Sequence, residues 1–267
     1  MIRLIASDLD GTIIDGNGHC DPSVVQTIQK FREKGIRFAV CSGRPISSVL
    51  PLLEGWNLDE CCDYIVGSNG GEILNVETNK KVVSYTLDAD LLKEIIDLYE
   101  PQGCVATYYG EDGLLYVQKE TPQVISMCKR IQMDYVVADI KELTKTPQIK
   151  EMFVIDPSDM EKIETFYQQH LDDRYIGFKT AYDLFEINHP LLAKDVGIRI
   201  IATQMGITKD EIMAFGDTTN DVEMLSYVKY GIAMKNGTDD AKSVAYAIAE
   251  SVDDCGFMKY IEENVLS

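Results

Sequence analysis

Two aspartates, Asp8 and Asp10, stand directly before a glycine and are the first residues of this chain that could do chemistry. The apolar run 4–6 before them, closed by Gly11, is typical of a buried strand. Side chains two apart on a strand share a face, so both carboxylates are expected side by side at its carboxyl end. Carboxylates that close raise one another's proton affinity and favour a bound cation or a shared proton. Gly11 permits a tight turn and a close approach of the backbone to a ligand.

The same residues have other readings. The pattern Asp-x-Asp-Gly also forms ordinary turns, because Asp and Gly favour turn conformations for local reasons. It also resembles the start of a calcium-binding loop. However, Gly11 follows the second aspartate at once, and no glutamate stands where such a loop would close. From this segment alone, a turn and a functional site remain open alternatives.

Further reactive groups follow later strands. The predicted strand 36–41 is followed by Ser42-Gly43-Arg44-Pro45, and the predicted strand 211–215 by Gly216-Asp217-Thr218-Thr219-Asn220-Asp221. A helix predicted from Leu192 to Met205 carries Lys194 in its first turn. The carboxyl ends of parallel strands meet at one edge of a sheet, where ligands bind. We therefore expect these groups to join the two aspartates at that edge.

The elements that must position these groups form an α/β pattern. Asp21-Pro22 predicts a helix start, and the helix is expected to end at Lys34-Gly35. Strand, helix and strand within about 40 residues indicate a βαβ unit and a parallel sheet. The same rhythm returns after His189-Pro190, with a further strand expected at 230–234. We predict an α/β fold with a Rossmann-like parallel-sheet core, formed by residues 1–83 and 189–267.

Residues 84–188 have a different pattern of expected helices and strands, and are predicted to be an inserted α+β domain. Helices are expected at 89–99, 122–131 and 158–170, and strands at 105–109, 114–117, 150–155 and 184–187. Strands in neighbouring pairs with helices between them indicate an antiparallel module. Tyr108, Tyr109, Glu111 and Asp112 cluster on one predicted loop that could line a pocket. A hairpin with cross-strand aromatic packing is the alternative.

Composition excludes several classes of protein. The 267 residues include 44 acidic and 25 basic side chains, a net charge of −19, which opposes a nucleic-acid partner. A phosphate substrate would need a metal or a few local basic groups. There is no run of about 18 apolar residues to span a membrane, and the early aspartates interrupt any secretory signal. Seven scattered cysteines without a C-x-x-C pair predict reduced thiols in a cytoplasmic protein.

The gathered groups suit phosphoryl chemistry. Carboxylates are ligands that Mg²⁺ accepts, while a lysine and a serine can bind phosphoryl oxygens. A carboxylate can act as nucleophile toward phosphorus once the charge of the substrate is neutralised. Asp10 is then placed to protonate the leaving oxygen and to activate water.

The four motifs Asp8–Thr12, Ser42–Pro45, Lys194 and Gly216–Asp221, in this order, resemble those of the haloacid dehalogenase superfamily. The position of the insertion resembles the cap domain of its Cof-type (class IIB) sugar-phosphatase branch. The resemblance implies that Asp8 is the nucleophile and Asp10 the general acid/base. It implies a phosphoryl site formed by Ser42, Gly43, Lys194 and Asn220, and Mg²⁺ held by Asp8, the Asp10 carbonyl and Asp217. Asp221 and Thr12 would support these groups, and Tyr108, Tyr109 and Glu111 of the cap would contribute to specificity.

We therefore predict a Mg²⁺-dependent phosphatase that hydrolyses small phosphorylated metabolites, sugar phosphates above all, through an aspartyl-phosphate. A sugar phosphomutase shares every core residue and remains an alternative within the fold. A sensor that binds phosphorylated ligands without turnover is an alternative from another class. Two departures from the family pattern, Thr218 and Asp195, remove no chemical group. The sequence predicts no oligomeric state.

Overall fold

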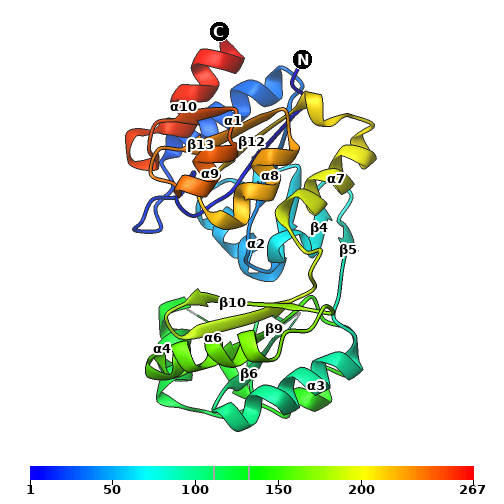
Figure 1. Cartoon of the computed structure of the whole chain (residues 1–267). Helices are drawn as coiled ribbons and strands as arrows, with labels where there is room; N and C mark the ends of the chain where they lie inside the picture. The colour runs from blue at the N-terminus through cyan, green and yellow to red at the C-terminus, as the bar shows by residue number, and fades with distance from the viewer. Residues whose placement is uncertain (111, 132) are drawn as a thin grey trace. The chain divides into compact units, whose positions relative to one another are not determined.

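The computed structural model describes residues 1–110, 112–131 and 133–267. The chain forms two compact units, which are described separately below (Figure 1). The first unit contains Met1–Ser84 and Ala193–Ser267, and the second contains Tyr85–Leu192. Among the described residues, no helix has the length and apolar character needed to cross a membrane.

The first unit is built on an eight-stranded sheet, which confirms the predicted α/β class. The strand order is β14-β13-β12-β1-β2-β3-β4-β5. Neighbours from β14 to β3 are parallel, while β4 and β5 add an antiparallel hairpin at one edge. The strands are β1 (Leu4–Ser7), β2 (Arg37–Cys41), β3 (Tyr64–Gly67), β4 (Glu72–Asn75), β5 (Lys80–Val83), β12 (Ile212–Gly216), β13 (Tyr230–Met234) and β14 (Ala247–Ala249).

Helices cover both faces of this sheet. One face packs against α1 (Pro22–Glu33), α2 (Ile46–Gly55) and α10 (Gly256–Ile261). The other packs against α7 (Lys194–Met205), α8 (Val222–Tyr227) and α9 (Asp239–Val244). As predicted, α1 begins after Asp21, whose carboxylate accepts a hydrogen bond from the N–H of Ser23. The short helical segments of this unit are 59–61, 68–70, 209–211, 219–221, 252–254 and 262–266.

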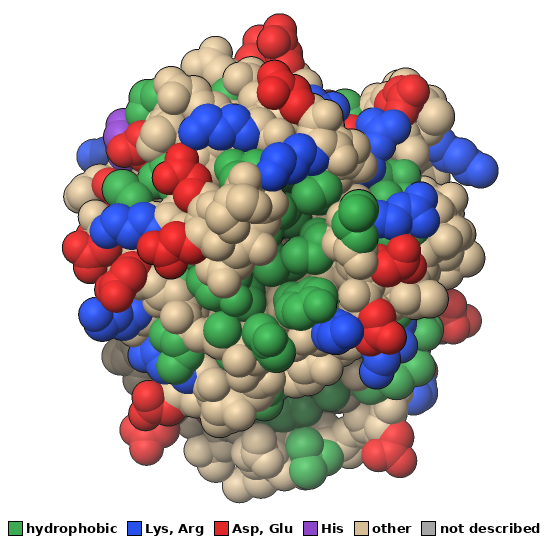
Figure 2. Space-filling view, turned by 90° about the horizontal axis from the view of Figure 1, so that it is seen from above, with side chains coloured by type: hydrophobic (Ala, Val, Ile, Leu, Met, Phe, Trp, Pro, Cys, Tyr) green, Lys and Arg blue, Asp and Glu red, His purple; other side chains and the backbone are tan. Residues whose placement is uncertain are grey.

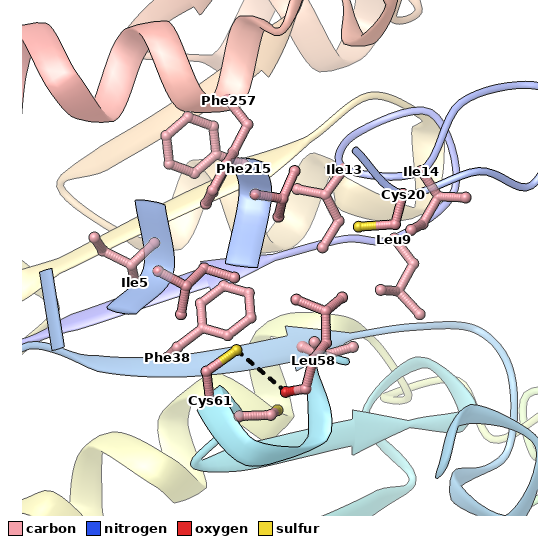
Figure 3. Packing of buried hydrophobic residues seen from close by; sticks show 14 of the residues in the cluster. Ile5, Leu9, Ile13, Ile14, Cys20, Phe38, Leu58, Cys61, Phe215 and Phe257 are labelled. Carbon is pink, nitrogen blue, oxygen red and sulfur yellow. Dashed lines mark hydrogen bonds between the residues drawn. The ribbon is translucent and has the colours of Figure 1, made fainter. Parts of the chain in front are cut away.

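The core on the α1 side fixes β1 at the centre of the sheet. Ile5 lies on that face with Phe38, Phe215 and Phe257, all of them buried (Figure 3). The rings of Phe215 and Phe257 meet edge to face, with their centroids 4.8 Å apart. Burying each such side chain stabilises the fold by about 1.5–3 kcal/mol. Leu4 and Ala6 alternate with Ile5 along β1, so they point to the opposite face of the sheet and pack in the core on the α7 side.

The second unit has its own six-stranded sheet, in the order β10-β11-β9-β6-β7-β8. Helices α3 and α6 pack on one face and α4 on the other. The elements are α3 (Ala89–Tyr99), β6 (Val105–Tyr109), β7 (Leu115–Val117), α4 (Pro122–Ile131), β8 (Tyr135–Val137), α5 (Ile140–Leu143), β9 (Lys150–Val154), α6 (Met160–Gln169), β10 (Ile176–Ala181) and β11 (Leu184–Asn188), with short helical segments at 100–102 and 157–159. The prediction of a purely antiparallel module is wrong in one place. The strands β7 and β8 are parallel, because α4 forms a crossover between them.

Candidate active site

Asp8 lies directly beyond β1, at the carboxyl edge of the parallel sheet. Its N–H donates to the carbonyl of Phe215 in β12 (2.9 Å), which extends the strand pairing by one residue. Its side chain is only 9% exposed. The Nζ atom of Lys194 lies 2.6 Å from Oδ1 of Asp8 and 2.7 Å from Oδ1 of Asp221. One fully buried ammonium group therefore joins two carboxylates from different loops.

Lys194 is the first residue of α7. The helix was predicted to start at Leu192, and this is wrong by two residues. Ala193 precedes the helix with extended backbone angles (φ −155°, ψ 157°), so helical geometry begins only with the lysine. The helix ends at Gly206, whose φ of +62° suits glycine.

Asp217 and Asp221 belong to the loop that follows β12. Oδ2 of Asp221 accepts hydrogen bonds from the N–H groups of Asp217 and Thr218, each at 3.0 Å. Both oxygens of Asp221 are thus engaged, one by Lys194 and one by the loop backbone. The hydroxyl of Thr12 donates to Oδ1 of Asp217 (3.2 Å). These bonds order the loop and aim the Asp217 carboxylate toward the loop that follows β1.

Burial and crowding of these acids shift their ionisation. Burial raises the pKa of Asp8 to about 8, while the charge of Lys194 acts in the opposite direction. Burial, followed by the negative charge of Asp221, raises the pKa of Asp217 to about 6. For Lys194, burial lowers the pKa, but the attraction of Asp8 and Asp221 prevails and raises it above its ordinary value. The lysine therefore stays charged, and the site holds more negative charge than it can neutralise by itself.

This surplus of negative charge fits a divalent cation. Oxygen atoms of Asp8, Asp217 and Asp221 all lie within 4.8 Å of one another. One ammonium group faces these three carboxylates, and oxygen ligands suit Mg²⁺. Gly11 has a φ of +85°, and a Cβ there would overlap Oδ2 of Asp217. A glycine is therefore needed for the backbone after Asp10 to approach the acidic cluster.

Asp10 differs from the expectation that it lies beside Asp8 on one strand face. The strand ends at Ser7, so strand alternation does not extend to Asp10. Its carboxylate is 56% exposed and forms a two-pronged ion pair with Arg44, with both N–O distances at 3.1 Å. Arg44 belongs to the predicted second motif, but its pairing with Asp10 was not foreseen.

The remaining candidate phosphoryl-binding residues lie on the loops that follow β2 and β12. They are Ser42, Gly43 and Asn220. Ser42 is buried, and its Oγ accepts a hydrogen bond from the N–H of Arg44 (3.1 Å). Gly43 and Asn220 both lie beside Asn69, because a Cβ on Gly43 would be 3.2 Å from Asn69 Oδ1 and Nδ2 of Asn220 donates to the same oxygen (3.2 Å).

Two contributing residues were missed by the sequence analysis. Asn69 follows β3 at the same sheet edge, so the available signal was its place directly after the short apolar run 64–66. Asn236 donates from Nδ2 to the carbonyl of Gly11 (2.8 Å) and likewise follows a strand of the parallel sheet, the one predicted at 230–234.

The expected specificity residues of the second unit do not form one loop. Tyr108 and Tyr109 are the last residues of β6, so their side chains point to opposite faces. Tyr108 pairs across the hairpin with Tyr116, with ring centroids 6.0 Å apart, as the alternative reading predicted. Tyr109 packs in the cluster on the α4 side. Their grouping in one pocket is therefore wrong, and Glu111 lies outside the described residues.

A haloacid dehalogenase-like hydrolase family profile matches residues 5–261, almost the whole chain. The chain belongs to the haloacid dehalogenase-like hydrolases. Solved structures agree in fold. A haloacid dehalogenase-like hydrolase from Bacteroides thetaiotaomicron has a TM-score of 0.87 at 23% identity, with 98% of this chain and 99% of that chain covered. The subclass IIB sugar phosphatase BT4131 has a TM-score of 0.79 at 19% identity, with 98% of each chain covered.

Relatives of this haloacid dehalogenase-like hydrolase carry phosphatase names. YxeH of Bacillus subtilis, named as a phosphatase without a substrate, is 27% identical over 269 residues and covers all of both chains. The HMP-PP phosphatase of Escherichia fergusonii is 26% identical over 238 residues, which is 88% of this chain and 85% of that protein. The family and these relatives identify the chain as a phosphoric monoester hydrolase.

Proposed function

We propose that this enzyme is a Mg²⁺-dependent phosphatase that works through an aspartyl-phosphate at Asp8. The observation that carries the proposal is the buried contact of Asp8 with Lys194, at a sheet edge where two more carboxylates converge. A buried aspartate held by a lysine is placed to act as a nucleophile whose position is fixed before substrate arrives. The lysine also offers positive charge to phosphoryl oxygens at the same point.

Asp8 and Asp217 would hold the metal ion, together with the backbone carbonyl of Asp10. When bound, Mg²⁺ supplies neutralisation of the charge on the phosphoryl oxygens. Asp221 has both oxygens committed to Lys194 and to backbone N–H groups, so it acts as a positioning group for them. Thr12 holds Asp217 through its hydroxyl.

The reaction then needs two displacements at phosphorus. A carboxylate oxygen of Asp8 attacks phosphorus and forms an O–P bond, while the ester P–O bond breaks and Asp10 protonates the leaving oxygen. In the second step Asp10 accepts a proton from water, whose oxygen attacks phosphorus and releases phosphate and free Asp8. Ser42, Gly43, Lys194 and Asn220 bind the phosphoryl oxygens during both steps.

We propose small phosphorylated metabolites, sugar phosphates among them, as substrates. The net charge of −19 opposes a polyanionic partner, so the substrate phosphate is met by local groups. On the face shown in Figure 2, basic side chains are interspersed with acidic ones and do not gather in one patch. Relatives named for phosphorylated small molecules, such as the HMP-PP phosphatase, support this class of substrate. We further propose that the second unit acts as a cap domain that selects among leaving groups.

The test is substitution of the nucleophile. Asp8→Asn keeps the shape and the buried position but removes the reactive carboxylate. Hydrolysis of p-nitrophenyl phosphate with Mg²⁺ should fall by at least about 10³-fold. The exposed Asp59→Asn serves as a matched control and should retain wild-type activity. Normal turnover by a folded Asp8→Asn variant would contradict the mechanism.

A further inference from the structure

Asn69 contacts two loops that carry candidate phosphoryl-binding residues. Its N–H donates to the carbonyl of Ser42 (3.0 Å), and its side-chain Oδ1 accepts a hydrogen bond from Nδ2 of Asn220 (3.2 Å). Gly43 lies against the same side chain, since a Cβ there would be 3.2 Å from Asn69 Oδ1. The Ser42 loop follows β2 and the Asn220 loop follows β12. Asn69 therefore joins two parts of the site that are far apart in the sequence.

The backbone around Asn69 is held in a conformation that only glycine adopts freely. Ser68, Asn69 and Gly70 all have positive φ, at 50°, 52° and 94°. The buried carboxylate of Glu72 supports the segment, because its Oε2 accepts hydrogen bonds from the hydroxyl of Ser68 (3.2 Å) and from the N–H of Ile46 (3.0 Å). A strained segment that the surrounding structure keeps in place is a common feature of functional sites.

The amide of Asn220 is held at both ends, although the residue is exposed. The hydroxyl of Thr218 donates to its Oδ1 (2.6 Å), and its Nδ2 donates to Asn69. In this arrangement Oδ1 of Asn220 faces Thr218 and its Nδ2 faces Asn69. Nδ2 has two hydrogens, so one remains for an acceptor such as a phosphoryl oxygen.

We propose that Asn69 is a positioning residue, which orients the amide of Asn220 toward the phosphoryl group. This inference rests on the proposed function, because that function assigns Asn220 to the phosphoryl oxygens. Without the Oδ1 of Asn69, the Asn220 amide keeps only the bond from Thr218 and can rotate. A rotated amide presents its oxygen to the phosphoryl group, which repels it.

Asn69→Gly tests the inference with little change to the backbone, because glycine accepts the positive φ. Asn79→Gly is a matched control, since Asn79 is an exposed asparagine with a φ of 51° in the turn between β4 and β5. Asn220→Ala and the double variant Asn69→Gly/Asn220→Ala complete a cycle. Two readouts are measured with Mg²⁺ present: kcat/KM for p-nitrophenyl phosphate, and the Kd of inorganic phosphate by calorimetry.

We expect Asn69→Gly to lower kcat/KM by about 10- to 50-fold and to weaken phosphate binding. Asn79→Gly should stay within about twofold of wild type. The double variant should match Asn220→Ala within about twofold in both readouts, because Asn69 has nothing to orient once the Asn220 amide is absent.

Two results would overturn the inference: wild-type values for Asn69→Gly, or losses that multiply in the double variant. The readouts also separate this inference from the proposed function. A wild-type protein that binds phosphate without turnover contradicts the proposed phosphatase mechanism, and the phosphate-affinity cycle then decides the role of Asn69. A wild-type protein that neither binds inorganic phosphate nor hydrolyses p-nitrophenyl phosphate contradicts both.

Discussion

Lys194 is fully buried, with its Nζ atom 2.6 Å from an oxygen of Asp8 and 2.7 Å from an oxygen of Asp221. Breaking a buried ion pair by removing one partner is costly, because the remaining charges lose their compensation. The stability of the site and the chemistry that we propose for it therefore depend on the same side chain. The metal-free protein shows this dependence most directly, since no other cation then compensates the acids.

We predict that Lys194→Met lowers the free energy of unfolding by about 3–5 kcal/mol at pH 8 in EDTA. The loss should be smaller at pH 5. Lys194 is one of the groups that lower the pKa of Asp217, which is about 6, so removing the lysine raises that pKa further. Asp217 is mostly protonated at pH 5 in both proteins, whereas at pH 8 the variant must ionise it without the compensating charge of the lysine. Chemical denaturation at the two pH values measures both quantities. Lys259→Met, at an exposed lysine of α10, should change stability by less than about 0.5 kcal/mol. An equal loss at both pH values for Lys194→Met would argue against this account.

At the residue scale, the sequence predicted which groups gather better than how they pair. Asp8, Ser42, Lys194 and Asp217 were placed at one edge because each follows a strand or begins a helix that a parallel sheet directs there. Pairings such as Asp10 with Arg44 depend on side-chain rotamers across 34 positions of sequence, which no local pattern encodes. The pairing of Asn69 with Asn220 is a second example, since the two residues are 151 positions apart.

At the element scale, β9 of the second unit contains a buried acid away from the candidate active site. Glu151 is 1% exposed, and its Oε1 accepts a long hydrogen bond from the N–H of Thr107 (3.3 Å). Its Oε2 has no hydrogen-bond partner among the residues that the structure describes. Burial raises the pKa of Glu151 well above its ordinary value of 4.5. The folded protein therefore keeps a proton that the unfolded chain releases.

This difference gives a pH dependence of known sign. The stabilising contribution of the neutral Glu151 is complete below about pH 4.5, and it is lost as pH rises toward the raised pKa of the folded state. Glu151→Gln cannot ionise, so its stability relative to wild type should increase between pH 4.5 and pH 8. The increase is at most about 1.4 kcal/mol per pH unit, and denaturation across this range measures it.

Glu186→Gln on β11 is the matched control for Glu151→Gln. Glu186 is also nearly buried, but it pairs with Lys150 at 3.0 Å. The same substitution there should destabilise the protein at pH 8, which is the opposite sign. A stability difference between Glu151→Gln and wild type that did not change with pH would show that Glu151 ionises normally.

The sequence predicted central elements better than edge elements. The strands β1, β2 and β12 have continuous apolar runs, because helices cover both of their faces. The edge strand β5 begins Lys80-Lys81, is largely exposed, and has no apolar alternation to detect. The three-residue β8 is too short for a periodic signal. Its parallel pairing with β7 depends on the packing of α4, which a search for strand patterns does not include.

At the scale of the whole molecule, the chain comprises two units with separate sheets and separate cores. The groups assigned to phosphoryl chemistry all belong to the first unit. The proposed function assigns to those groups the recognition of a phosphoryl group and a metal ion, and none of these roles distinguishes the alcohol that the phosphate esterifies. On that proposal, discrimination among substrates comes from residues outside this set, and the second unit is the largest candidate.

The structure of the first unit offers a way to test phosphoryl chemistry separately from discrimination among substrates. The hydroxyl of Ser84, its last residue before the second unit, donates to the carbonyl of Gly70 (2.6 Å). Ala193, its first residue after the second unit, also lies against Gly70, since a Cβ on that glycine would overlap the Ala193 carbonyl oxygen. The two ends meet at one residue, so a flexible linker of about four residues can connect them.

We predict that replacing residues 85–192 by such a linker leaves measurable Mg²⁺-dependent hydrolysis of p-nitrophenyl phosphate, because every group assigned to phosphoryl chemistry is retained. The same change should flatten the preference among sugar phosphates, measured as the spread of kcat/KM over a panel of phosphorylated metabolites. The shortened protein must first show cooperative unfolding, which its separate core predicts.

A preference that survives intact would place specificity in the loops of the first unit, beginning with Ser68–Gly71. Complete loss of aryl-phosphate hydrolysis in a folded shortened protein would show that the second unit contributes to the chemical step itself.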